Sequence, residues 1–72
     1  MDITILEVVG FDGESYEDID ALAHLGTADQ VFYSVNWGGE DHYRWIGGPF
    51  ETVDDVIEAI EENEEFYVEL AG

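Results

Sequence analysis

Residues 30–46, QVFYSVNWGGEDHYRWI, contain the clearest structural signal in the chain. Aromatic and β-branched residues predominate in 30–37 and again in 42–46, which is typical of half-buried β-strands. The segment between them, 38–41, is Gly-Gly-Glu-Asp, a composition that favours a turn. We therefore predict a β-hairpin with strands over 30–37 and 42–46, and we expect Gly47-Gly48-Pro49 to end the second strand.

Two further elements are predicted on the N-terminal side of this hairpin. The run ITILEVV at 3–9 is dominated by β-branched residues and indicates a strand that ends at Gly10. Ser15 is a candidate helix N-cap with Asp18 three residues later, so we predict a short helix over about 16–25. Gly26 follows this segment and is expected to terminate the helix.

The C-terminal side contains the strongest helical pattern. Thr52 is a candidate N-cap with Asp55 at the third helical position. Apolar residues then recur with helical spacing at Val53, Val56, Ile57 and Ile60. After Asn63, the run EFYVEL at 65–70 alternates apolar and polar residues, and we predict a final strand there.

The predicted element order is β-α-β-β-α-β in one small α+β domain spanning residues 1–72. The split βαβ or ferredoxin-like arrangement is the best-known fold with this order, and it places two helices on one face of an antiparallel sheet. The alternative is a three-stranded antiparallel sheet with helices packed irregularly.

The composition is extremely acidic. Nineteen Asp and Glu residues face a single Arg and no Lys, so the formal net charge is −18. This charge balance excludes proteins that bind nucleic acids or anionic membranes through Lys and Arg side chains. The chain is nevertheless 46% hydrophobic, which favours a folded domain over a disordered acidic tail.

Several functional classes lack the residues that they need. The chain has no cysteine, no serine–histidine–acid signature and no calcium-binding loop pattern. His24 and His42 are the candidate bases, and we interpret both as surface or boundary residues. We therefore predict no enzymatic activity, no metal site and no cofactor. No secretion signal or long apolar run is visible, so we expect a cytoplasmic location.

The acids are concentrated in and beside the two predicted helices, since residues 14–20 and 51–65 together contain 12 of the 19 carboxylates. Like charges three or four residues apart destabilise a helix by about 0.2–0.5 kcal/mol per pair. Residues 61–65 also place acids at the expected end of the second helix, where the dipole disfavours them. We interpret this as a surface positioned for a partner. Halophilic adaptation and a plain solvated face are the competing interpretations.

By this distribution of helix acids, the chain resembles the small acidic DNA-mimic inhibitors of phages and mobile elements, of the anti-CRISPR and anti-restriction types. The resemblance is one of composition, and no shared motif defines the group. It implies a non-catalytic decoy that occludes the channel of a basic nucleic-acid-binding protein or effector complex in the host cytoplasm. It implies no direct contact with nucleic acid or membrane.

The predicted partner contacts are helix acids with two aromatic anchors. They are Asp54, Glu58, Glu61, Glu62, Glu65, Glu17, Asp20, Trp37 and Trp45. Arg44 is expected to neutralise a neighbouring acid. A homodimer would lengthen the anionic surface and is left open. The alternative function is a halophilic structural or interaction protein with no decoy role.

Overall fold

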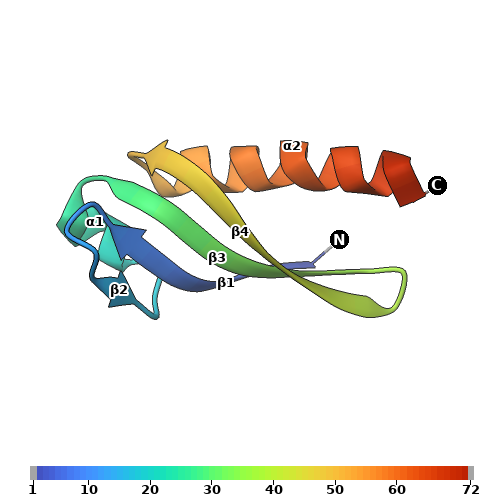
Figure 1. Ribbon diagram of the computed structural model, residues 1–72, viewed down its shortest axis with the longest axis horizontal. Coiled ribbons are helices and arrows are strands. Elements are labelled where there is room, and N and C mark those ends of the chain that lie inside the picture. The colour runs from blue at the N-terminus through green and yellow to red at the C-terminus, as the bar shows by residue number, and fades with distance from the viewer. Residues whose placement is uncertain (1, 72) are drawn as a thin grey trace.

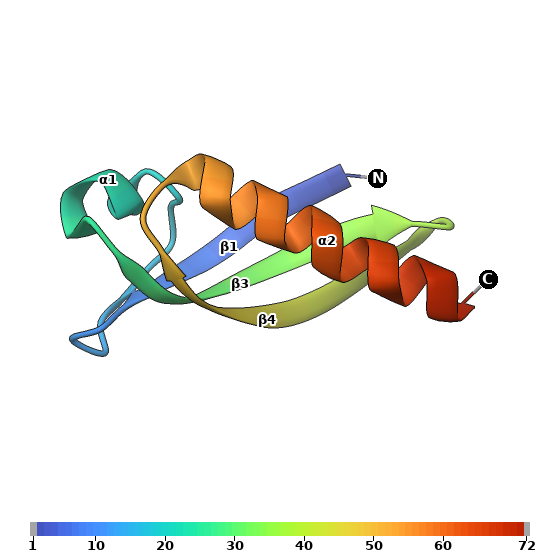
Figure 2. The same ribbon diagram turned by 90° about the horizontal axis from the view of Figure 1, so that it is seen from above.

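A computed structural model of the chain describes residues 2–71, apart from the side chains at 21, 23 and 71. Its elements are β1 (Asp2–Gly10), β2 (Ser15–Tyr16), α1 (Ala21–Leu25), β3 (Ala28–Trp37), β4 (Glu40–Phe50) and α2 (Val53–Ala71). The strands form one antiparallel sheet in the order β2-β1-β3-β4, and α2 crosses one face of this sheet (Figures 1 and 2).

The predicted hairpin is confirmed, and its second strand is longer than expected. Trp37 pairs with Glu40 across a turn in which Gly38 and Gly39 have φ values of 65° and 81°. Positive φ at both turn residues suits glycine and matches the twist of the strands. The expected break at 47–49 is wrong, because β4 continues to Phe50. Gly48 lets the strands approach closely, since a Cβ there would lie 2.6 Å from the Ala28 carbonyl oxygen.

The predicted helix over 16–25 is wrong at its start. Ser15 does not cap a helix, because Ser15 and Tyr16 form β2 and pair with Val9 and Val8. The chain returns to β1 through a tight turn in which the Gly10 amide donates to the Glu14 carbonyl at 3.0 Å. Helix α1 is consequently limited to five residues. Its predicted end is confirmed, since Gly26 has a φ of 78° and its amide donates to the Leu22 carbonyl.

Helix α2 begins as predicted but extends much further. The Thr52 hydroxyl accepts a 3.1 Å hydrogen bond from the Asp55 amide, which confirms the N-cap. The helix continues to Ala71, so the predicted strand over 65–70 is wrong. The buried stripe Val56, Ile60 and Glu64 keeps a spacing of four residues into this region. Residues 61–65 therefore lie in the middle of the helix rather than at its C-terminal end.

These differences change the topology while leaving the class intact. The α+β class and the antiparallel sheet are confirmed, but the β-α-β-β-α-β order and the pair of covering helices are wrong. One long helix, α2, replaces the predicted second helix and last strand. No helix among residues 2–71 combines the length and apolarity that a membrane crossing requires.

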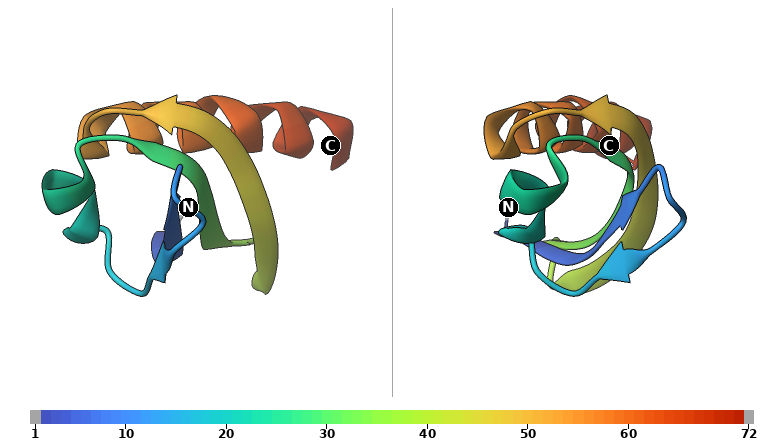
Figure 3. Two further views of the ribbon diagram at one scale, coloured as in Figure 1. Left: turned by 60° about the vertical axis from the view of Figure 1, so that its left-hand side comes forward. Right: turned by 90° about the vertical axis from the view of Figure 1, so that its left-hand side faces the viewer.

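The core lies between α2 and the inner face of the sheet. Alternate residues of β3 point toward α2, and Val31, Tyr33 and Val35 are fully buried there against Val56 and Ile60. The sheet is strongly curved, so that β4 rises toward α2 at one side (Figure 3). The molecule is consequently elongated, with extents of 38 × 17 × 17 Å, and α2 runs along its long axis.

Neither helix of the described residues 2–71 covers the opposite, outer face of the sheet. A register shift between Ile5 and Glu7 in β1 places Ile5 opposite Tyr33 but Glu7 opposite Phe32. Ile5 therefore shares the inner face with Tyr33, and Glu7 shares the outer face with Phe32. Two surfaces of the molecule are thus exposed on opposite sides, namely the solvent face of α2 and the outer face of the sheet.

Candidate partner-binding surfaces

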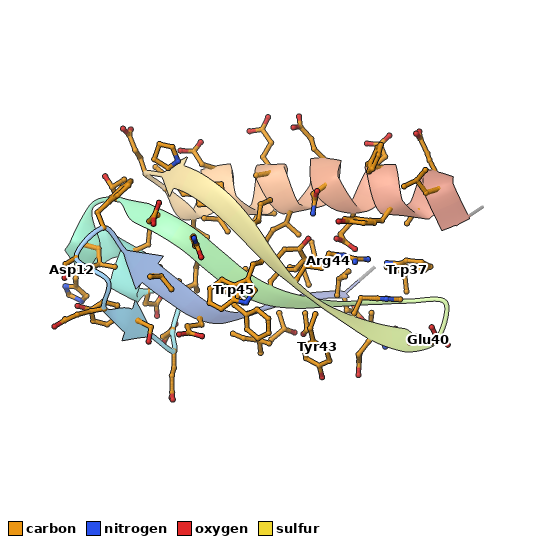
Figure 4. The ribbon with its side chains drawn as sticks, in the orientation of Figure 1. Asp12, Trp37, Glu40, Tyr43, Arg44 and Trp45 are labelled. Atoms are coloured by element: carbon orange, nitrogen blue, oxygen red, sulfur yellow. The ribbon has the colours of Figure 1, made fainter. Side chains whose placement is uncertain are left out.

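One side of α2 is strongly anionic, while Phe66, Val68 and Leu70 are exposed apolar residues near the C-terminal end of the helix. Eight of its residues are acids, and all except Glu64 are exposed. We call the exposed set the acidic face: Asp54, Asp55, Glu58, Glu61, Glu62, Glu65 and Glu69. Figure 4 shows carboxylates of α2 projecting away from the sheet. The five helix acids predicted as partner contacts all belong to this face. Asp55 shares it, and Glu69 joins them because the helix is longer than expected.

The chain's only strong cation is absent from the acidic face. Arg44 projects from β4 toward the inner side of α2, where its Nε donates a 2.7 Å hydrogen bond to Oε2 of Glu64 (Figure 4). The expectation that Arg44 neutralises a neighbouring acid is therefore confirmed. Because the chain contains no lysine, no Lys or Arg side chain is left to balance the acidic face.

Glu64 is the centre of a buried polar cluster. Its side chain has no solvent exposure, and its carboxylate also accepts hydrogen bonds from the Tyr33 hydroxyl at 2.6 Å and the Trp37 indole at 3.3 Å. The Asn63 amide donates to the Tyr33 oxygen at 2.9 Å. The cluster links α2 to both strands of the hairpin, so it fixes how the helix lies on the sheet.

The cluster shifts the titration of its acidic groups. Burial works to raise the pKa of Glu64, but the hydrogen bonds that its carboxylate accepts outweigh burial and hold the pKa below its usual value. Burial and the hydrogen bond to the Glu64 carboxylate raise the pKa of Tyr33 to about 12. The carboxylate is thus kept ionised and the phenol protonated, which is the pairing that their hydrogen bond requires.

Sequence reasoning counted Glu64 among the helix acids and did not anticipate this cluster. A signal for it exists, because Glu64 continues the apolar stripe four residues after Ile60. In a chain with a single strong cation, an acid on the buried face of a helix indicates the partner of that cation. Tyr67 continues the same stripe, and the Arg44 guanidinium lies 3.7 Å from its ring centroid.

The hairpin aromatics divide between the two faces of the sheet. Trp37 is on the inner side and is partly buried against α2, where it stacks on His42 with ring centroids 4.3 Å apart. Trp45 and Tyr43 project from the outer face and are 51% and 63% exposed (Figure 4). The predicted anchors Trp37 and Trp45 therefore do not share a surface, and only Trp45 lies on the open side.

A shallow hollow lies beside this aromatic group on the outer face. Its volume is about 500 Å³, and it is lined by Ile5, Leu6, Glu7, Ser15, Glu17 and Phe32. The predicted contact Glu17 therefore lies next to the outer face of the sheet, away from the acidic face. Asp20, the other secondary contact, is exposed in the turn before α1. The structure separates both residues from the acids of α2.

Among the described residues, no three carboxylate or imidazole side chains converge as a metal-ligand group. His24 is exposed on α1, whereas His42 is held against Trp37.

Comparisons of the chain with protein-family models, with curated proteins and with solved structures found no match.

Proposed function

We propose that this chain is a nucleic-acid mimic that binds a basic nucleic-acid-binding protein and blocks its channel, most specifically as an anti-CRISPR protein. One observation supports this proposal above the others. The acidic face is exposed along α2, while the single arginine that could neutralise it is bonded to Glu64 on the inner side. A purely structural helix gains nothing from such an arrangement.

The spacing of the charges is close to that of a nucleic-acid strand. Asp54 and Glu69 are fifteen residues apart, so the acidic face extends for about 22 Å along the helix axis. Its seven carboxylates therefore occur about every 4 Å, compared with one phosphate per about 3.4 Å along one strand of B-DNA. A cationic channel shaped for a phosphate backbone would find a similar density of negative charge on this helix.

The proposed mechanism is occlusion without catalysis. The field of a chain with a net charge of −18 would accelerate encounter with a cationic channel, and the rigid helix would hold its charges in register once bound. Since the interaction is electrostatic, inhibition should weaken as salt screens the surface charges. The site of action would be the cytoplasm in which the effector operates.

The test is competition with DNA for purified effectors. Mobility-shift assays would measure DNA binding by a panel of CRISPR effector complexes and restriction enzymes at increasing concentrations of the chain. We expect at least one effector to lose DNA binding. The triple variant Glu58→Gln/Glu61→Gln/Glu62→Gln should lose this inhibition, because it removes the centre of the acidic face.

The matched control removes the same charge elsewhere. Asp2→Asn/Glu40→Gln/Glu51→Gln neutralises three exposed acids outside α2, so it has the same net charge as the test variant. It should retain inhibition. Equal loss of inhibition in both variants would show that only total charge matters. If the chain displaced DNA from none of the tested effectors, the proposal would be contradicted.

A halophilic interaction protein is the second candidate, because exposed acids also occur on the strands and connecting turns away from α2. In that case the anionic shell serves hydration in concentrated salt. Circular dichroism against KCl concentration separates the two proposals. A mimic should be folded in dilute buffer, whereas a halophilic domain should fold only as the salt concentration approaches molar values. Unfolding at low salt would favour the second candidate.

A further inference from the structure

The outer face of the sheet contains a continuous row of one carboxylate and two aromatic rings. Glu7 of β1 is directly opposite Phe32 of β3, which is directly opposite Trp45 of β4. The Phe32 and Trp45 rings lie 4.8 Å apart between centroids, and Tyr43 joins Phe32 at 6.3 Å. Neighbours in such a row are close enough for one ligand group to touch several of them.

The hollow extends this row past β1. Phe32 and Leu6 provide apolar surface to it, and Glu7 and Glu17 add two acids from β1 and from just beyond β2. The site therefore combines an aromatic surface with two neighbouring acids. The hollow is shallow and open to solvent, so it suits a single side chain of a partner rather than an enclosed small molecule.

We propose that this outer face binds an arginine side chain presented by a basic partner segment. A guanidinium is planar, so it can stack on Phe32 and Trp45 while its N–H groups donate to the Glu7 and Glu17 carboxylates. A lysine ammonium offers a point charge and no flat surface. Arginine is thus the cation that can both stack on the aromatic rings and pair with the carboxylates.

Charge complementarity favours this occupant over the others. A second copy of the chain would bring another −18 charges to a face that already contains carboxylates, so self-association is opposed. Nucleic acids and anionic lipids are repelled for the same reason. The chain's own cation, Arg44, is on the inner side and cannot fill the hollow. A cationic partner group is attracted by the carboxylates, and the aromatic rings shield it from water.

This inference concerns a different surface from the proposed decoy. The acidic face lies on α2, and the hollow lies on the opposite side of the sheet. Arginine recognition can therefore be tested, and can fail, independently of DNA competition. If both proposals hold, a channel that encloses the molecule could contact the two surfaces at once.

The test is an NMR titration with three acetylated and amidated tripeptides, glycine–X–glycine, where X is arginine, lysine or citrulline. We expect the arginine peptide to shift the Trp45 indole signal and the Glu7 and Phe32 amides. It should bind about threefold tighter than the lysine peptide through stacking. The citrulline peptide has a similar shape but no charge and should not bind measurably.

Two charge-matched variants locate the site. Glu7→Gln/Glu17→Gln should weaken arginine binding about fivefold by removing two ion pairs. Glu58→Gln/Glu61→Gln removes the same charge from the acidic face and should change binding less than about twofold, because distant charges are screened. Trp45→Ala, at a half-exposed position, should reduce the preference for arginine over lysine.

Three outcomes would overturn the inference: equal binding of arginine and lysine peptides, equal weakening by the two paired variants, or shifts confined to α2. Each of them would indicate diffuse attraction to a polyanion. Circular dichroism of every variant would verify that its fold is intact. If Glu7→Gln/Glu17→Gln did not fold, the single variant Glu17→Gln, at an exposed position outside the strands, would test the same carboxylate site.

Discussion

The Nε atom of Arg44 lies 2.7 Å from Oε2 of Glu64, and this contact joins the edge strand β4 to the middle of α2. It pairs the chain's only strong cation with the buried carboxylate of the described core. The Glu64 carboxylate also accepts hydrogen bonds from the Tyr33 hydroxyl and the Trp37 indole. Removing either charge therefore affects both the stability of the domain and the position of the acidic face.

Breaking the pair on one side should be costly. Arg44→Met leaves Glu64 buried without its counter-ion, and we expect the free energy of unfolding to fall by about 3 kcal/mol. Glu64→Leu should cost less, because the Arg44 side chain is 19% exposed and can reach water. The double variant Arg44→Met/Glu64→Leu should recover most of the loss. Urea denaturation measures all four proteins, and additive losses in the double variant would contradict the pairing.

The same pair predicts how stability changes with acid. The pKa of Glu64 in the folded protein lies below its usual value of 4.5, so its contribution is complete above that value and is lost as the pH falls through the folded pKa. Protonation of exposed carboxylates relieves repulsion over the same range. Arg44→Met/Glu64→Leu has the same net charge and is therefore the reference. The wild type should lose stability relative to this reference below about pH 4.5.

The raised pKa of Tyr33 predicts how the stability of the fold changes at alkaline pH. Its pKa of about 12 lies above the usual value of 10.0, so the protonated phenol stabilises the fold fully below pH 10 and this contribution is lost toward pH 12. Tyr33→Phe cannot ionise at this position. The difference in unfolding free energy between wild type and Tyr33→Phe should therefore shrink between pH 10 and pH 12. A constant difference over that range would contradict the shift.

The acidic face should reduce stability in the free protein. Glu58→Gln/Glu61→Gln/Glu62→Gln removes several like-charge pairs at three and four residues, and should raise the free energy of unfolding by about 1–3 kcal/mol at low salt. The gain should decrease as added NaCl shortens the screening length. The control Asp2→Asn/Glu40→Gln/Glu51→Gln should gain less. An equal gain in both would show that net charge, rather than helix spacing, sets the cost.

Two adjacent glycines offer a test of the β3–β4 contact. A Cβ at Gly48 would lie 2.6 Å from the Ala28 oxygen and 2.7 Å from the Phe50 nitrogen, whereas a Cβ at Gly47 meets nothing within 4 Å. Gly48→Ala should therefore lower the unfolding free energy by about 1–3 kcal/mol. Gly47→Ala should change it by less than about 0.5 kcal/mol. Thermal or urea unfolding compares the two directly.

The features that sequence reasoning predicted correctly are local ones. The Gly38-Gly39 turn, the Thr52 cap and the Gly26 helix end each depend on residues within a few positions of one another. The acidic face is also local, because helical spacing alone decides which side chains share a side. Such features require no knowledge of what packs against them.

The errors occurred where distant contacts outweigh local pattern. EFYVEL at 65–70 alternates like a strand, yet it is helical because the helix that contains Glu64 and Tyr67 is held to β4 by Arg44. Ser15 resembles a cap, yet it pairs with Val9 because the turn after Gly10 folds the chain back onto β1. In both cases a contact between separate elements selected one of two locally acceptable structures.

The sequence by itself determined the charge, the hairpin, the start of α2 and the existence of an anionic helix face, since composition and short-range spacing decide these. Only the tertiary structure decided that Arg44 turns inward to Glu64, that Trp37 and Trp45 lie on opposite faces, and that Glu17 joins Glu7 beside Phe32. The physical reason is that strand register and helix placement depend on burial across the whole chain. One register shift in β1 is enough to change which face a side chain occupies.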